Sequence, residues 1–381
     1  FFSIFFKYNV SGEKMKIAIF HNYMDNIGGS ELVCLILARE LGADIYTTNV
    51  NEKKIRKMGF STDNIYSLGK VPVNAPFKQQ YAYWKFKKLN LRRKYDFYII
   101  GGDWALSGVV NNKPNLWYLY SPMGEIWNFY KHTRKNSVPW FERWIFDLWV
   151  LYHRLMTRKN IYHVGKVVSI SRNVGNRVEK YFKKMSAVIY PPIETSKFYS
   201  GKNGDYWLSV NRLINHKRVE MQIKAFSKIP DEKLIIVGSY EHSKHFKKYV
   251  NYIKKIKPDN VEIISWVSDG KLKELYANCK GFITTSIDED FGMSVVEAMA
   301  SGKPVIAPNE GGYRETVING KTGILLDDMG SNKLAKAVKD LGKIILKNPE
   351  KYKTVCIEQA KIFDSKVFIE KMKKEIGVAR V

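Results

Sequence analysis

The feature that most constrains the fold is a regular alternation of short apolar runs with longer helical stretches, separated by turns that carry glycine or proline. In the first half of the chain such runs occupy residues 16–20, 95–100, 116–120, 166–170 and 187–190. Short, continuously apolar runs are typical of parallel strands whose two faces are buried by crossover helices. The alternation therefore predicts an α/β fold with a doubly wound parallel sheet.

The alternation stops once and then begins again. A Pro-Pro pair at residues 191–192 ends the first series, and a polar, glycine-bearing stretch follows at residues 200–204. A second series of runs occupies residues 206–210, 233–237, 261–265, 281–286 and 304–308. We predict two Rossmann-like domains, residues 1–195 and 196–365, with a final helical stretch at residues 366–381 that crosses back to the first domain. A cleft between two such domains is the usual ligand site.

The length and the cysteine usage fit this layout. The 381 residues suffice for two hydrophobic cores, and no run approaches the ~20 apolar residues that span a bilayer. The three cysteines, Cys34, Cys279 and Cys356, lack metal-ligand spacing, so we expect free thiols and a cytoplasmic location. Residues 1–14 precede Met15 and the first apolar run, and we interpret them as an extension.

The segment at residues 284–307 carries the most specific chemistry. A buried strand is expected to end at Ser286, an acidic loop with Glu289 follows, and Gly292 opens a helix. The first N–H groups of a helix have no partner within it, and together with the helix dipole they form an anion site. Glu297 lies on the second turn in an apolar run, where a carboxylate needs donors such as sugar or ribose hydroxyls. Taken alone, the two glutamates are equally well read as a solvated loop acid and a surface helix position.

The amino-acid sequence of this segment resembles that of a known family. The matching residues are Asp290-Phe291-Gly292, Val296-Glu297-Ala298-Met299-Ala300, Gly302 and Pro304-Val305-Ile306-Ala307. They resemble the E-x7-E region of retaining glycosyltransferases of family 4, which have the GT-B fold, with Glu289 and Glu297 as the two glutamates. The resemblance extends from about residue 16 to about residue 326, and is closest to mannosyltransferase-like members.

The resemblance implies roles for these residues. Glu289 would contact the donor sugar, and Glu297 would bind the ribose of the nucleotide. The backbone N–H groups of Phe291, Gly292, Met293 and Ser294 would hold sugar hydroxyls and phosphate, and Asp290 is a further donor-binding residue. The triplet at residues 288–290 also matches the D-x-D metal motif of a different glycosyltransferase fold, but a match of three residues is common by chance. Since the tandem α/β layout argues against that fold, we expect no metal and no other cofactor.

A basic pair follows the first strand of the second domain. Arg212 and Lys217 lie five residues apart across a strand-to-helix turn, so both side chains can converge on one diphosphate. An isolated pair in so basic a chain is more simply read as a surface loop. The similar family motif favours cations that stabilise the leaving nucleoside diphosphate in place of a metal ion.

Several further positions match the family less sharply. Gly29, in a Gly-Gly pair after the first strand, would let backbone amides approach the donor phosphate, and Ser30 is the expected N-cap of the helix that follows. Gly238 ends a strand at the expected cleft, and Trp266-Val267 occupies the position where relatives hold the nucleobase. Asp269 is read as a helix N-cap. A second Gly-Gly pair at residues 311–312 is a candidate for another close approach to the ligand.

One departure from the family stands out. Relatives commonly carry a histidine before a Pro-Met turn, and here Tyr120 stands at that position, with Gly124 in place of an arginine. A tyrosine can donate a hydrogen bond to a sugar hydroxyl but does not titrate near neutrality. A histidine base is therefore not expected at this position, and the donor-sugar specificity of relatives does not carry over directly to this chain. The alternative is that Tyr120 only packs in the core.

Basic and aromatic residues are interleaved in the first domain. The net charge is +26, and residues 74–94 and 127–159 combine many lysines and arginines with tryptophans and tyrosines. Apolar positions 141, 145, 148, 152 and 155 follow helical spacing. Three interpretations are open: core packing with solvated charges, a peripheral membrane face, or a nucleic-acid groove with stacking aromatics. The family resemblance favours the membrane face, because similar enzymes often glycosylate lipid-linked acceptors.

The sequence therefore predicts a retaining, metal-independent glycosyltransferase that moves a hexose from a nucleotide-diphosphate sugar onto a glycan acceptor. GDP-mannose is the first donor expected and a UDP-hexose the second. We expect a lipid-linked acceptor, the cytoplasmic face of an anionic membrane as a partner, and no nucleic acid. Two alternatives are kept: a nucleic-acid-binding protein on a Rossmann-like scaffold, and a disaccharide synthase with a soluble acceptor.

Overall fold

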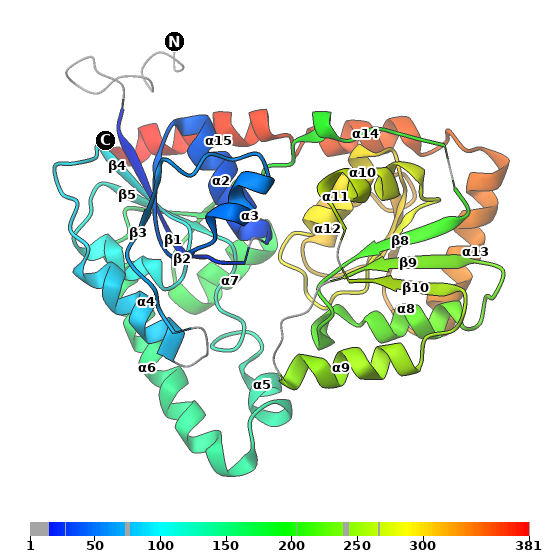
Figure 1. Cartoon of the computed structure of the whole chain (residues 1–381), viewed down its shortest axis with the longest axis horizontal. Coiled ribbons are helices and arrows are strands. Elements are labelled where there is room, and N and C mark those ends of the chain that lie inside the picture. Colours follow the sequence, from blue (N-terminus) through cyan, green and yellow to red (C-terminus); the bar gives the residue numbers. More distant parts are fainter. Residues whose placement is uncertain are drawn as a thin grey trace. The chain divides into compact units, whose positions relative to one another are not determined.

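The computed structural model describes residues 15–26, 28–72, 77–202, 204–238, 244–265 and 267–380. Within it the chain forms two compact units, the first ending at Pro192 and resuming at Lys366, and the second running from Ile193 to Ser365 (Figure 1). The boundary after Pro192 lies three residues before the predicted domain boundary at residue 195. The expected extension at residues 1–14 and the expected nucleobase contact at Trp266 lie outside the described residues.

The first unit contains a seven-stranded sheet in the order β3-β2-β1-β4-β5-β6-β7, and all neighbouring strands are parallel. The strands are β1 (Ile17–Met24), β2 (Asp44–Val50), β3 (Ile65–Ser67), β4 (Phe97–Ile100), β5 (Asn115–Leu119), β6 (Lys166–Ser169) and β7 (Ala187–Val188). The strand order reverses between β1 and β4, which is where ligands bind in such sheets.

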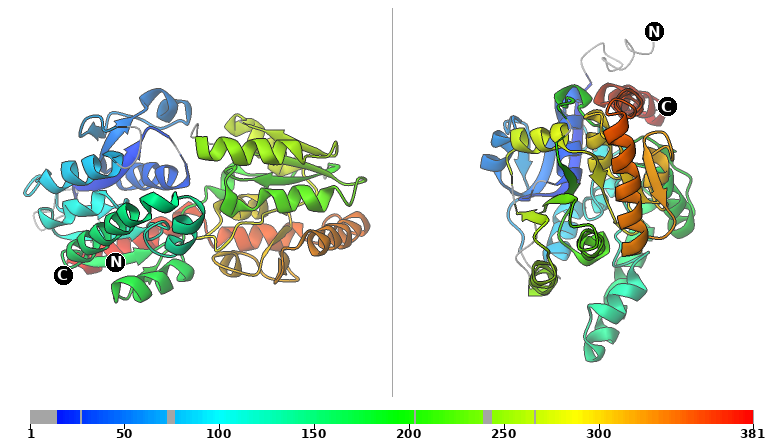
Figure 2. Two further views of the ribbon diagram at one scale, coloured as in Figure 1. Left: turned by 90° about the horizontal axis from the view of Figure 1, so that it is seen from below. Right: turned by 90° about the vertical axis from the view of Figure 1, so that its right-hand side faces the viewer.

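The helices of the first unit connect and cover this sheet. They are α2 (Gly29–Leu41), α3 (Glu52–Lys57), α4 (Phe77–Lys88), α5 (Tyr130–Asn136), α6 (Arg143–Ile161), α7 (Arg172–Phe182) and α15 (Ser365–Arg380), with 3₁₀ turns η1 (Ala105–Val110) and η2 (Trp140–Glu142). The C-terminal helix α15 lies against the first unit, where the Phe368 ring meets the Tyr118 ring and Glu375 pairs with Lys166. The stretch from α5 to the start of α6 projects away from the sheet of its own unit (Figures 1 and 2).

The second unit contains a six-stranded parallel sheet in the order β10-β9-β8-β11-β12-β13. The strands are β8 (Tyr206–Val210), β9 (Lys233–Val237), β10 (Val261–Ile264), β11 (Phe282–Ile283), β12 (Val305–Pro308) and β13 (Gly323–Leu326). The helices are α8 (Val219–Phe226), α9 (Lys244–Lys255), α10 (Asp269–Asn278), α11 (Met293–Ala300), α12 (Tyr313–Thr316), α13 (Ser331–Lys347) and α14 (Lys353–Lys361). Here the strand order reverses between β8 and β11, so the loops after these two strands meet at the carboxyl edge of the sheet.

The predicted fold class, two doubly wound parallel-sheet units, is confirmed. The sequence reading missed β2, β3 and β13. It also overestimated β11, because the chain leaves the ladder after Ile283 to build a loop. The apolar positions at 141, 145, 148, 152 and 155 are exposed, so the core-packing interpretation of this helix is wrong. None of the helices in the described ranges combines the length and apolarity needed to cross a membrane.

Candidate functional site

The loops after β8 and β11 are tied together by their backbones. The first carries a short 3₁₀ turn, η4 (Asn215–Lys217), and the second is the acidic loop that leads to α11. The Ile287 N–H donates to the His216 carbonyl at 2.8 Å, and the Thr285 hydroxyl donates to the Lys217 carbonyl at 2.7 Å. These bonds fix the position of the basic turn relative to the acidic loop.

Lys217 and Glu289 form a largely buried ion pair. The Lys217 Nζ lies 2.5 Å from the Glu289 Oε2, and the two side chains are 14% and 18% exposed. The Tyr313 hydroxyl lies 3.4 Å from the same carboxylate oxygen. Burial acts to raise the pKa of Glu289, but the Lys217 ammonium, with smaller contributions from Ser286 and His216, outweighs burial and lowers the pKa to about 2. Glu289 is therefore ionised at any physiological pH.

The N-terminus of α11 directly follows this pair. Its N-cap, Gly292, has a φ of +90°, and a Cβ at this position would lie 2.6 Å from the Tyr313 ring, so only glycine fits. The backbone N–H groups of Met293 and Ser294 make no hydrogen bond to another residue in the described ranges. Free N–H groups at a helix N-terminus favour an anion.

Glu297 has a partner that the sequence reading did not identify. Its carboxylate accepts a hydrogen bond from the Tyr276 hydroxyl of α10 at 2.8 Å. Burial is the main cause that raises the pKa of Glu297, and the Tyr276 bond opposes it. The sequence predicted that ligand hydroxyls donate hydrogen bonds to this carboxylate. The structure shows that the protein itself supplies one such hydrogen bond, from Tyr276. Among the described residues, Tyr276 is the only hydrogen-bond partner of this carboxylate.

Arg218 is a second residue that sequence reasoning missed. Its Nε donates to the Thr285 carbonyl at 2.6 Å, and its guanidinium pairs with Glu310 at 2.5 Å. It therefore joins the loops after β8, β11 and β12. The available signal was the run of three basic residues at 216–218, of which only Lys217 was singled out.

Two of the predicted glycines are required by the protein's own packing. A Cβ on Gly311 would lie 2.5 Å from the Glu289 carbonyl oxygen, and the Gly312 N–H donates to that oxygen at 2.7 Å. A Cβ on Gly238 would lie 2.5 Å from the Leu213 side chain. Residues 311–312 therefore approach the acidic loop closely and hold it in place. The basic loop after β8 leaves no room for a side chain at Gly238.

The remaining predicted residues of the second unit are less tightly placed. Arg212 is exposed, and among the described residues its guanidinium makes no hydrogen bond or ion pair; its carbonyl accepts from the Ile214 N–H at 3.0 Å. Val267 is half-buried just before α10. The N-cap of α10 is Ser268, whose hydroxyl accepts from the Lys271 N–H at 3.2 Å, so the Asp269 assignment is wrong. Asp269 is instead the first helical residue and pairs with a lysine one turn later.

The predicted glycine loop of the first unit follows β1. The N-cap of α2 is Gly28 rather than Ser30, because the Glu31 side chain accepts from the Gly28 N–H at 2.8 Å and fixes the helix start there. Gly29 is the first helical residue. Burial acts to raise the pKa of Glu31, but the contact with His21 and the Gly28 N–H lower it overall.

His21 brings a buried imidazole next to Tyr120. Its Nε2 lies 3.2 Å from the Glu31 carboxylate, and its ring meets the half-buried Tyr120 ring edge-on at 6.1 Å between centroids. Its Nδ1 is buried and has no partner among the described residues. Burial raises the pKa of Tyr120 well above its usual value, so its hydroxyl stays protonated. Sequence reasoning missed His21, although a histidine that directly follows the first apolar run was visible.

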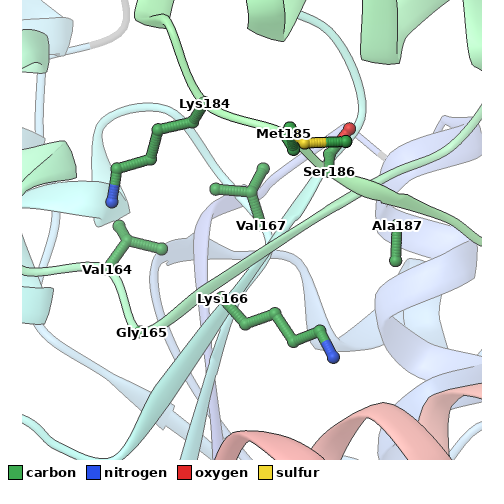
Figure 3. Close-up of a pocket in the computed structure, with 8 residues that line it drawn as sticks. All are labelled: Val164, Gly165, Lys166, Val167, Lys184, Met185, Ser186 and Ala187. Atoms are coloured by element: carbon green, nitrogen blue, oxygen red, sulfur yellow. The ribbon is translucent and has the colours of Figure 1, made fainter.

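A pocket elsewhere in the first unit does not overlap these residues. About 350 Å³ lies open between the starts of β6 and β7, lined by residues 164–167 and 184–187 (Figure 3). The Lys166 side chain extends toward α15, where it pairs with Glu375. The pocket is at the amino ends of the strands, whereas ligands of such sheets bind at the carboxyl ends. Among the described residues, no group of three His, Cys, Asp or Glu side chains is arranged to hold a metal ion.

Part of the chain matches a known protein family. Residues 192–362 match the family described as Glycosyl transferases group 1. An uncharacterized glycosyltransferase of Methanocaldococcus jannaschii is 29% identical, over 57% of this chain and 58% of the relative. The alpha-1,3/1,6-mannosyltransferase ALG2 of Candida glabrata is 25% identical, over 59% of this chain and 61% of the relative. The chain thus spans less than two thirds of the length of these relatives.

Solved structures show the same architecture over nearly the whole chain. Anabaena HepE, solved in complex with UDP and glucose, superposes with a TM-score of 0.73 at 17% identity, and the match covers 95% of this chain and 99% of HepE. A likeness at this identity establishes the fold. The part of the chain that matches the glycosyl transferases group 1 family, residues 192–362, is nearly the whole second unit, and the chain as a whole has the GT-B fold.

Proposed function

We propose that this protein is a retaining hexosyltransferase that moves a hexose from a nucleotide-diphosphate sugar onto a glycan acceptor. The observation that carries the proposal is the buried Lys217–Glu289 pair next to the free N–H groups at the start of α11. A cation, a carboxylate kept ionised and a helix N-terminus together match a donor that has an anionic diphosphate and a sugar that becomes positively charged as it reacts.

The charges assign a role to each group. The bond between the sugar anomeric carbon and the diphosphate oxygen breaks, and negative charge grows on that oxygen. Lys217 and the N-terminus of α11 stabilise this charge, and the exposed Arg212 adds a second cation when it swings onto the diphosphate. We therefore propose that no metal ion or other cofactor is required. Glu297, held by Tyr276, binds the ribose hydroxyls.

The pKa of Glu289 limits what this carboxylate can do. Because its pKa is about 2, it has no proton to donate near neutrality and is a poor base. Its negative charge instead stabilises the positive charge that develops on the sugar ring. The acceptor hydroxyl then forms the new bond on the face that the diphosphate leaves, and its proton passes to the leaving phosphate oxygen. This order of events retains the anomeric configuration.

The donor and the acceptor are inferred from relatives. ALG2 and the Salmonella O-antigen chain enzyme RfbU are both named mannosyltransferases, which supports GDP-mannose as the first donor. HepE was solved with UDP-glucose, which supports a UDP-hexose as the second. We propose a lipid-linked glycan acceptor and a peripheral position on the cytoplasmic face of an anionic membrane. The basic charge of the chain supports this placement.

The test is a turnover assay with GDP-, UDP- and ADP-hexoses, with and without EDTA, followed by proton NMR of the new anomeric linkage. We expect one nucleotide sugar to be used, EDTA to have no effect, and the configuration to be retained. Lys217→Ala should reduce turnover by about a hundredfold or more. Lys224→Ala, an exposed lysine on α8, is the matched control and should leave it unchanged. Inversion of configuration, or equal turnover in the two variants, would contradict the proposal.

A further inference from the structure

One face of η2 and α6 is apolar and open to solvent. Apart from one adjacent pair, Trp144 and Ile145, the exposed side chains follow each other at intervals of three or four residues, which places them along one side of a helix. They are Trp140 (79% exposed), Trp144 (63%), Ile145, Leu148 (58%), Leu151 and Leu155. We call these six residues the outer face of α6. Isolated exposed apolar residues are ordinary, but a continuous stripe of this length marks an interaction surface.

The opposite side of α6 already has its partner. Val150 and His153 are buried, the His153 ring lies 5.0 Å from the Trp104 ring, and its Nε2 is hydrogen-bonded to Gln80 of α4 at 2.7 Å. Asn160 is also buried on this side. The helix is thus fixed to its unit by one face while the other points away, and its start lies on the part that projects from the sheet (Figures 1 and 2).

Basic residues flank the outer face. Between residues 130 and 162 the chain has seven lysines and arginines and only two acids, Glu142 and Asp147. Asp147 is neutralised by Arg134, which donates to both of its carboxylate oxygens. The exposed cations of this region are Lys131, Lys135, Arg158 and Lys159. The region therefore presents an apolar stripe with a positively charged border.

We propose that the outer face of α6 docks onto an anionic lipid bilayer, with the helix lying in the headgroup region. Apolar side chains on one face, tryptophans near its end and cations along its border are the features of an interfacial helix. Anionic headgroups attract the border, whereas a second copy of this chain, itself at +26, would repel it. This inference rests on the proposed function in one respect: docking would serve to bring the enzyme to a lipid-linked acceptor.

The test is flotation of the full chain with vesicles of phosphatidylcholine alone or with about 30% phosphatidylserine. The wild type should float with anionic vesicles, and less at about 0.5 M salt. Leu148→Gln/Leu151→Gln removes apolar area without changing charge or a buried contact, and should weaken partitioning by about tenfold. Leu346→Gln, at a still more exposed leucine on α13 of the second unit, is the control and should float like the wild type.

Several results would overturn the proposal. These are no flotation of the wild type at low salt, equal flotation of the Leu148/Leu151 variant, or a dimer in sedimentation velocity that the same variant dissociates. Each variant is also assayed with a soluble acceptor analogue. Loss of flotation with turnover retained separates this docking surface from the donor site, so failure of either claim is distinguishable from failure of the other.

Discussion

Replacing Lys217 with methionine removes the charge that balances Glu289 and keeps the length of the side chain. In the wild type the pKa of Glu289 is about 2, against an ordinary value of 4.5, because the Lys217 ammonium, with smaller contributions from Ser286 and His216, outweighs burial. At about 1.4 kcal/mol per pKa unit this difference corresponds to about 3 kcal/mol of stability near pH 7. The variant loses that contribution and leaves a buried carboxylate without its cation.

The sign of the pH dependence follows from the lowered pKa. The ionised form of Glu289 stabilises the fold above its ordinary pKa, and this stabilisation is lost as the pH falls from 4.5 toward about 2. The difference in free energy of unfolding between the wild type and Lys217→Met should therefore be largest near pH 7 and fall to about 1 kcal/mol near pH 3.

The assay is thermal unfolding of the wild type and the variant at both pH values. For a unit of this size, a loss of about 3 kcal/mol lowers Tm by roughly 6–12 °C. The control is Lys336→Met, which breaks an exposed pair with Asp340 on α13 and should change the free energy of unfolding by less than about 1 kcal/mol. Lys217→Met/Glu289→Gln should recover much of the lost stability. The reasoning fails if Lys217→Met is as stable as the control, or if its deficit is the same at both pH values.

Three further substitutions probe the rest of the site. Tyr276→Phe removes the hydrogen-bond donor to Glu297 and should lower the free energy of unfolding by about 1–3 kcal/mol near pH 7, measured by urea unfolding. Gly292→Ala forces a side chain into a φ of +90° and should lower Tm by several degrees, whereas Gly270→Ala, with open space around it, should not. Arg218→Lys keeps the charge but loses the guanidinium group that bonds to two other loops at once, so KM for the nucleotide sugar should rise. An unchanged KM would show that these loops are held by other contacts.

The fold was predictable wherever burial on both faces made a strand uniformly apolar. The run at residues 95–100 contains β4 for this reason, because all four residues of that strand are apolar and buried. Strand β2 was missed because it contains Thr47 and Thr48, two buried threonines that break the apolar run. The Thr48 hydroxyl is satisfied by the Asn22 carbonyl at 2.7 Å, a partner from another strand that no local pattern reveals.

The site was predictable where a motif is local and not where a partner is distant in sequence. Glu289, Glu297 and Lys217 lie in short, recognisable segments. The bond between Arg218 and Thr285 joins positions 67 residues apart, and that between Tyr276 and Glu297 joins two different helices. Such pairs depend on the order of strands in the sheet, which the sequence does not state.

The most direct test of the account is equilibrium binding of GDP and UDP, measured by calorimetry in the presence of EDTA. We predict that one nucleotide binds the wild type, and that Glu297→Ala and Lys217→Ala each bind it at least about tenfold more weakly while Lys224→Ala binds it normally. Binding that is equally strong in all three variants would contradict the placement of the donor in the second unit.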